Sequence, residues 1–394
     1  FLRALIPSNL LFLMVLILVF LYYFLNYKKM YLKNKEAFFI VLLLINVGFI
    51  KGVISNSLSI ALVSYSTYIF LFLSATFVNN TIDKNQIMNS FIQLSTVFFI
   101  IIEIGAIIGI IYASCGGESL FFIKNPDGRT NSFYLTTFTN ATFGRFIRPS
   151  GLYDEPGAFS FFICVTVVIR TLYKKNKKVS LILLLLGLCT FSLTHILFSG
   201  IYIAYFLLTN KSRKENFMVI SFLILFFVIL FINFHELLNI LIFSRLEIDK
   251  STGMLTGDNR SNQIVQSIEL LNLKVFFLGV DDVFYTDYKA FKTVYGVLGE
   301  NILGPLVCRG IFTALPYYLF ILLLLISLCI SNNKIMALEI FLLWFQRPYF
   351  NNLGYVFYFS FFFVFYLNDI KKSERLIYLI KGKTPTNLSL IKQI

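Results

Sequence analysis

The chain has 394 residues, of which 58% are apolar and 14% charged, with a formal net charge of +14. Soluble domains carry about 25% charged residues, so the composition excludes an ordinary soluble protein, and it also excludes collagen-like, coiled-coil and disordered chains. The apolar residues fall into repeated blocks between short charged segments. This pattern predicts a polytopic membrane protein and excludes a single span attached to a soluble domain.

Eleven apolar segments are predicted to be transmembrane helices, because a helix needs about 20 residues to cross the hydrocarbon core and slightly fewer when its ends are anchored. The sixth and seventh form a tight helical hairpin. The odd count leaves Phe1 outside, which a missing first helix, making twelve, or a miscounted early span would explain. We therefore predict an all-α integral membrane protein. Its spans are 9–25, 37–50, 58–78, 91–112, 156–172, 179–193, 196–208, 217–234, 312–330, 335–345 and 353–367.

Clusters of lysine orient these spans, because basic residues are retained on the cytoplasmic side. The clusters at 28–35, 174–178, 211–214 and 371–383 all fall on one side under this span order. The tail 369–394 is therefore predicted to be cytoplasmic, and the two large loops, 113–155 and 235–311, to be external. Nucleic-acid binding is not expected, because no soluble basic face exists to carry it.

Arginine has a different distribution from lysine. Seven of the eleven arginines lie in or beside the predicted external face, where basic residues are disfavoured. The planar guanidinium group matches phosphate and carboxylate oxygens two at a time. The pattern therefore favours an external anionic substrate, although each arginine could instead pair with a loop carboxylate. The seven are Arg129, Arg145, Arg148, Arg245, Arg260, Arg309 and Arg347.

The densest group of charges precedes the fifth span. Arg145 and Arg148 are followed closely by Asp154 and Glu155, and Pro156 suits the first position of a helix. Because a helix N-terminus favours anions, this group could hold a phosphate and offer a proton acceptor. The alternative is a capped helix start with surface ion pairs.

The second large loop contains an amphipathic pattern over 261–277, directly after Arg260. A shorter one over 236–243 leads to Arg245. Both predict short helices that lie on the bilayer or close over a cavity. The loop ends near Glu300 and Asn301.

Four further titratable residues stand out. His195 in the hairpin turn and His235 are predicted to lie externally, where a neutral imidazole can accept a proton, although an interfacial histidine can also be a simple polar anchor. Glu103 and Glu339 lie within spans, where carboxylates are costly and indicate function. Of these two, Glu103 is the better candidate for an internal pair or polar cavity.

These motifs resemble the O-antigen polymerase (Wzy) family and, more distantly, the O-antigen ligases. The resemblance depends on the segment from Arg148 to Pro156 before a span, on Thr190 to Thr194 at a hairpin turn, and on Arg260 with Gly279 downstream. It extends over most of the chain as a layout of spans and two large external loops.

The resemblance implies a GT-C-like, metal-independent inverting glycosyltransferase without a cofactor. Such an enzyme polymerises undecaprenyl-pyrophosphate-linked repeat units at the periplasmic face of the bacterial inner membrane, among membrane lipids and beside a chain-length-regulating co-polymerase. The implied catalytic residue is Glu155, Asp154 or His195. The implied substrate-binding residues are Arg145, Arg148, Arg245, Arg260, Arg347 and Glu300.

Two other functions stay open at this stage. Ligases typically have a His before an Asn near the end of the second loop, and Glu300-Asn301 stands there, which favours polymerase over ligase. A flippase for lipid-linked oligosaccharides would also need basic residues facing a cavity. However, the predicted spans contain almost no Lys or Arg. This favours a reaction at the external face of the membrane over transport of an oligosaccharide across it.

Overall fold

The computed structural model describes residues 84–124, 129–239, 259–280, 288–296, 301–331 and 333–348, together with 50, 53, 243, 244, 247 and 298. The predicted spans 9–25, 58–78 and 353–367, all of 37–50 except residue 50, and the tail 369–394 lie outside this part. The described part is mostly helical. Its larger helices are α5 (Lys84–Ser114), α6 (Pro156–Leu172), α7 (Lys177–Gly187), α8 (Leu193–Thr209), α9 (Arg213–Leu238), α16 (Ile311–Ile330) and α17 (Lys334–Gln346).

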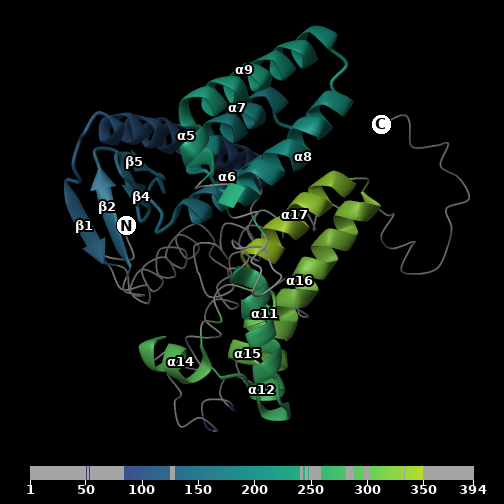
Figure 1. Cartoon of the computed structure of the whole chain (residues 1–394). Helices are drawn as coiled ribbons and strands as arrows, with labels where there is room; N and C mark the ends of the chain where they lie inside the picture. Colours follow the sequence, from purple (N-terminus) through teal and green to yellow (C-terminus); the bar gives the residue numbers. More distant parts are fainter. Residues whose placement is uncertain are drawn as a thin grey trace, which may run out of the picture.

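Helix α6 is the centre of the bundle. It packs against α5, α7, α8 and α17, and Figure 1 shows these helices gathered around it. Between Pro156 and Arg170 every residue except Gly157 is buried, as expected for a helix that is apolar on all sides. The helix bounds match the predicted fifth span, so the sequence placed the central helix correctly.

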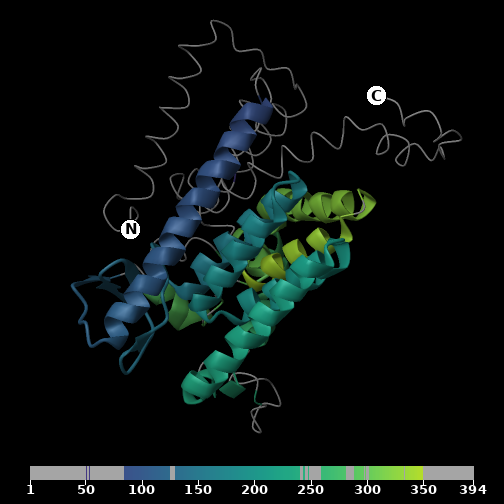
Figure 2. The ribbon, with the colours of Figure 1, turned by 90° about the horizontal axis from the view of Figure 1, so that it is seen from above.

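Two described helices are long and apolar enough to cross a bilayer. They are the Met88–Ser114 part of α5, with a mean hydropathy of 2.5, and α16, with 2.3. Figure 2 shows the length of α5 beside the rest of the bundle. Helices α6 and α8 are apolar but shorter, at 17 residues each. This is compatible with a membrane protein, and the count of eleven spans stays a prediction.

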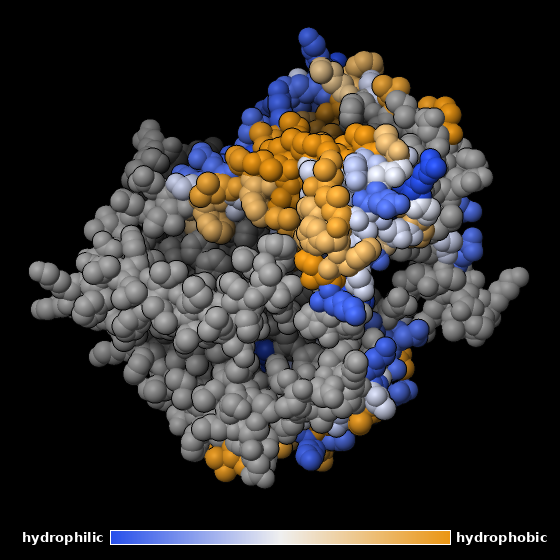
Figure 3. Space-filling view, turned by 90° about the vertical axis from the view of Figure 1, so that its left-hand side faces the viewer, coloured by the Kyte–Doolittle hydropathy of each residue, from blue (hydrophilic) through white to orange (hydrophobic). Residues whose placement is uncertain are grey.

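Large apolar side chains also point outward along whole helices. Leu94, Ile101 and Ile108 form such a stripe on α5, and Leu94 is 69% exposed. Similar stripes follow α9 and α16, for example at Ile224 and Leu322. Figure 3 shows orange side chains gathered in a continuous patch bordered by blue ones. A soluble monomer rarely exposes so much apolar surface, whereas a lipid-facing surface requires it.

The helix ends that carry the lysine clusters lie together. Lys175 Nζ donates to Asn89 Oδ1 near the start of α5 at 2.6 Å, and Lys177 Nζ donates to Thr209 Oγ1 at the end of α8 at 2.9 Å. Lys178 Nζ lies 2.9 Å from Glu215 Oε1 at the start of α9. The hydrogen bonds from Lys178 and Asn210 lower the pKa of the Glu215 carboxyl. Helices α5, α7, α8 and α9 thus place at one end the residues predicted to be cytoplasmic.

The sixth predicted span is shorter than expected. Helix α7 has 11 residues and therefore a length of about 16 Å, well below the ~30 Å of a hydrocarbon core. The chain then forms the 3₁₀ turn η1 (Leu188–Thr190), and Phe191 takes a left-handed conformation with φ 49° before α8 begins. The predicted hairpin is present, but α7 ends six residues before the predicted end of the span.

The first large loop contains strands, which the all-α prediction did not include. Antiparallel strands β1 (Phe121–Lys124), β2 (Thr130–Tyr134) and β3 (Thr137–Thr139) form one sheet, and β4 (Thr142–Phe143) pairs with β5 (Phe146–Ile147). These segments are rich in Thr, Phe and Tyr, which favour strands. This corrects the all-α prediction for the loop.

Glycines on α5 allow this sheet to dock. Thr136 Oγ1 donates to the carbonyl of Gly105 at 2.6 Å, and a Cβ at Gly109 would overlap the side chain of Thr137. We expect Gly109→Ala to destabilise the protein by about 1–3 kcal/mol, because the added carbon over-packs this contact. Thermal unfolding in detergent would measure the effect. Gly200→Ala on α8, where a Cβ meets open space, is the matched control, and equal melting temperatures for both variants would contradict the account.

The second large loop contains short helices, as predicted. They are α11 (Asn259–Leu270), α12 (Leu273–Leu278), α14 (Tyr288–Tyr295) and α15 (Gly304–Arg309). The single helix predicted over 261–277 is divided in two, because Asn272 caps α12 by accepting a hydrogen bond from Val275 N at 2.9 Å. Asn301 is buried and donates to Ser267 Oγ at 3.0 Å, which connects α11 to the start of α15.

Candidate functional site

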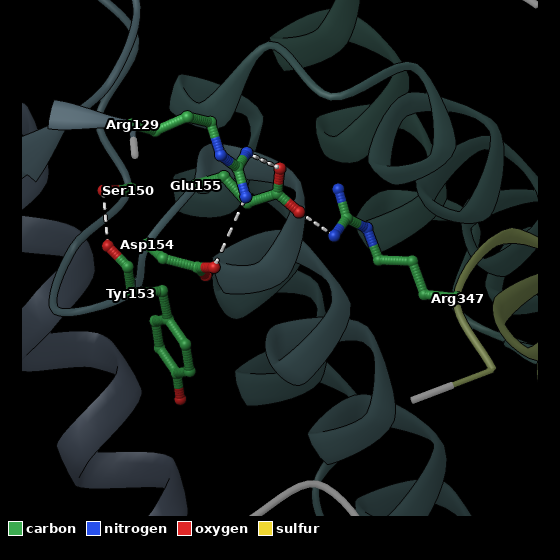
Figure 4. Close-up of polar contacts among 6 residues, drawn as sticks. All are labelled: Arg129, Ser150, Tyr153, Asp154, Glu155 and Arg347. Carbon is green, nitrogen blue, oxygen red and sulfur yellow. Dashed lines mark hydrogen bonds and ion pairs between the residues drawn. The ribbon is translucent and has the colours of Figure 1, made fainter. Parts of the chain in front are cut away.

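Glu155 is the N-cap of α6, and two arginines hold its carboxylate (Figure 4). Arg129 Nη1 donates to Glu155 Oε2 at 3.0 Å, and Arg347 Nη1 donates to the other oxygen, Oε1. Pro156 follows at the first helical position, as predicted, and the extended backbone of Glu155 directs the chain into the helix. A carboxylate and two guanidinium groups therefore meet at the N-terminus of the central helix. We call Arg129, Glu155 and Arg347 the arginine cluster.

The three members come from distant parts of the sequence. Arg129 directly precedes β2 in the first loop, 26 residues before Glu155, and Arg347 is the C-cap of α17, 192 residues after it. Arg347 has 10% of its side chain exposed, against 46% for Arg129. The guanidinium group of Arg347 is thus held inside the protein, and that of Arg129 is partly exposed to solvent.

Gly157 makes room for Arg347. A Cβ at this position would lie 2.5 Å from Arg347 Nη2, and the guanidinium group could not keep its contact with Glu155. We expect Gly157→Ala to weaken anion binding at the arginine cluster with little loss of stability, because alanine favours a helix more than glycine does. Anion binding and thermal midpoint, measured beside Gly200→Ala, would test this. A variant with normal anion binding would contradict a role for the Arg347 contact.

Asp154 is the accessible carboxylate of the site. It is 54% exposed and lies 3.9 Å from Arg129 Nη2. The turn before it is held by Ser150 Oγ, which donates to the carbonyl of Tyr153 at 2.8 Å. The Tyr153 ring stacks on Phe162 of α6, with ring centroids 4.9 Å apart. Asp154 is therefore held beside the arginine cluster while its oxygens face solvent.

Arg148 does not point its guanidinium group toward an open site. It is buried, Nε donates to the carbonyl of Thr190 at 3.3 Å, and Nη2 donates to the carbonyl of Phe191 at 3.2 Å. Phe146 adds an edge-on contact with the Phe191 ring. Arg148 thus fastens the first loop to the hairpin turn, where carbonyls after a short 3₁₀ turn lack helical partners. These contacts give Arg148 a structural role, and its role in substrate binding stays a prediction.

Arg145 lies apart from the arginine cluster, in a recess of about 350 Å³. The recess is bordered by the end of α5 and by the loop strands, with Glu118, Ser119 and Tyr134 in its wall. Arg145 is exposed, so its guanidinium group is accessible to an external ligand.

His195 is not on the external surface. It is fully buried, with Nε2 2.9 Å from the carbonyl of Leu184 and Nδ1 3.2 Å from Ser160 Oγ. The early end of α7 brings α8 deeper into the bundle than the sequence predicted, and His195 in its first turn follows. This position corrects the prediction of an external proton acceptor.

The other predicted site residues are less fully described. Arg245 and Glu300 lie outside the described residues. For Arg260 the structure gives only its place, the second residue of α11. The structure therefore unites Asp154, Glu155 and Arg347, and adds Arg129, which the sequence had singled out only as one of seven external arginines.

The arrangement can bind an anion and accept a proton at one place. Two guanidinium groups, one of them exposed, can hold phosphate oxygens, and an exposed carboxylate lies next to them. Comparison with known family models, with curated proteins and with solved structures finds no match for this chain. The chemistry of the site therefore has to be argued from its geometry.

Proposed function

We propose that this chain is a polytopic glycosyltransferase of the O-antigen polymerase type, acting on polyprenyl-pyrophosphate-linked glycan repeat units at the external face of a bacterial inner membrane. The observation that carries the proposal is the arginine cluster at the start of α6, at the bundle end opposite the lysine clusters. A lipid pyrophosphate in the outer leaflet would meet positive charge at this level. The resemblance of the segment from Arg148 to Pro156 to that family supports the same conclusion.

In this proposal the arginines bind the departing pyrophosphate. Arg129 and Arg347 stabilise the negative charge that develops as the bond between sugar and phosphate breaks, the kind of interaction that contributes most to many enzymes. Glu155 positions the two guanidinium groups, because each of its oxygens accepts from one of them. Arg347, fixed by burial, would set the position of the phosphate.

Asp154 accepts the proton of the attacking sugar hydroxyl. It is more exposed than Glu155, at 54% against 21% of the side chain, so a hydroxyl in solution can reach it. Both oxygens of Glu155 already accept hydrogen bonds from arginines, so they are less available to a sugar hydroxyl. Arg145 and its recess, which lie apart from the arginine cluster, provide a further place for the glycan.

Lysine substitution tests the phosphate-binding role. Arg129→Lys keeps the charge but loses the planar fork, so we expect weaker binding of the lipid-linked donor, seen as a higher KM. Exposed ion pairs alone contribute about 0–1 kcal/mol, and on that account Lys would replace Arg129 with little effect. Lys175→Arg at the lysine end is the matched control. Normal donor affinity in Arg129→Lys would contradict the assignment.

A further inference from the structure

Two carboxyl side chains in the bundle interior take no part in the proposed reaction. Glu103 on α5 and Glu339 on α17 are both 0% exposed. Neither carboxyl has a hydrogen-bond partner for either of its oxygens among the residues that the structure describes. A buried charge without a partner is very costly, and such residues within membrane helices indicate function. The cost has to be offset by a role that an apolar side chain could not perform.

Both residues lie on helices that pack on α6, and each carboxyl acts electrostatically on the Cys164 thiol of that helix. The two carboxyls form no hydrogen bond with each other. Cys189 is within range of Glu103, and Tyr202 is within range of Glu339. The titratable groups known to face the pair are thus two thiols and a phenol, with the His195 imidazole next to Cys164.

His195 connects this interior to the hairpin turn. Its Nε2 faces only a carbonyl, Leu184 O at 2.9 Å, so Nε2 carries the hydrogen and Nδ1 is an acceptor in the neutral ring. Nδ1 lies 3.2 Å from Ser160 Oγ and 3.5 Å from Cys164 Sγ. Gly187 permits this position, because a Cβ there would lie 2.7 Å from Nε2. The neutral imidazole therefore contacts two small polar groups of α6 in the bundle interior.

We propose that Glu103 and Glu339 each bind a proton inside the helix bundle, at two positions separate from the arginine cluster. Burial without a partner favours the protonated carboxyl, because the charged form loses its hydration. A metal ion fits less well, since the described part of the chain has no group of three or more His, Cys, Asp or Glu residues that could hold one. The proposed ligand is therefore a proton. Each carboxylate that binds one becomes a neutral carboxylic acid.

A hydrophobic carbodiimide tests the proposal directly. Dicyclohexylcarbodiimide partitions into apolar surroundings and reacts with the neutral acid. The carboxyl O–H adds across one C=N bond, oxygen going to carbon and hydrogen to nitrogen, and the adduct rearranges to a stable acylurea. The purified full chain would be labelled in liposomes at about pH 7.5, where an ordinary carboxyl of pKa about 4 is almost wholly ionised. Mass spectrometry of peptides locates the acylurea.

We expect an acylurea on Glu103, on Glu339 or on both, at least about tenfold above that on Asp154, which is the solvent-exposed reference. A water-soluble carbodiimide with an added amine should show the reverse preference. Glu103→Gln and Glu339→Gln should each remove the adduct at their own position and leave the melting temperature nearly unchanged, since a neutral amide replaces a neutral acid. No adduct on either residue while Asp154 reacts, or a large fall in melting temperature in both Gln variants, would overturn the proposal. None of these readouts depends on polymer formation.

Discussion

Replacing Asp154 with Asn is expected to lower the turnover of polymer formation by about 100- to 10,000-fold, the usual contribution of a general base. Asp154 faces solvent beside Arg129, so it can reach a sugar hydroxyl, and the amide keeps its shape but cannot take the proton. Turnover and KM for a lipid-linked repeat unit, at matched protein levels, would measure the effect.

Glu155→Gln is the paired variant for this test. If Glu155 positions Arg129 and Arg347, the amide weakens their placement, and KM for the donor should rise more than turnover falls. Nearly normal turnover in Asp154→Asn, together with lost turnover and unchanged KM in Glu155→Gln, would assign the proton transfer to Glu155 instead.

Arg148→Leu is expected to cause the largest loss of stability. The Arg148 guanidinium is buried and donates to the carbonyls of Thr190 and Phe191. An unsatisfied buried acceptor costs about 1–3 kcal/mol, and leucine would leave both carbonyls without this donor. We therefore expect a lower melting temperature and less protein in the membrane, with activity lost because the first loop detaches from the hairpin turn.

Arg148→Lys separates this structural role from phosphate binding. Lysine can reach one carbonyl but cannot bridge both, so stability should be intermediate between arginine and leucine. Activity per folded molecule should stay close to that of the unmodified protein. A normal melting temperature with a raised donor KM would instead show that Arg148 contacts substrate.

The sequence predicted the helices whose apolar runs end sharply. Pro156 and the lysine cluster after Leu172 bound α6 at both ends, and its predicted limits agree with the structure. The α7–α8 hairpin was harder, because Thr190 and Ser192 are the only polar residues between Leu181 and Leu193 and mark the turn weakly. Phe191 adopts the left-handed conformation, which phenylalanine rarely does. The sequence therefore contained no signal for this turn.

The candidate site was predictable only in part. Asp154, Glu155 and Pro156 are adjacent in the chain, so one motif revealed them. Arg129 and Arg347 reach Glu155 through tertiary packing, and the room that Gly157 leaves for Arg347 is a property of helix contacts. For the same reason a buried position for His195 and a structural role for Arg148 could not be read from spacing alone.

The most direct test of the polymerase proposal is to incubate the purified protein in liposomes with a synthetic polyprenyl-pyrophosphate-linked repeat unit and to size the products. The proposal predicts a ladder of longer lipid-linked glycans that the Asp154→Asn variant fails to make. A repeat unit that crosses the bilayer without being lengthened, or one that stays unchanged with folded protein present, would contradict it.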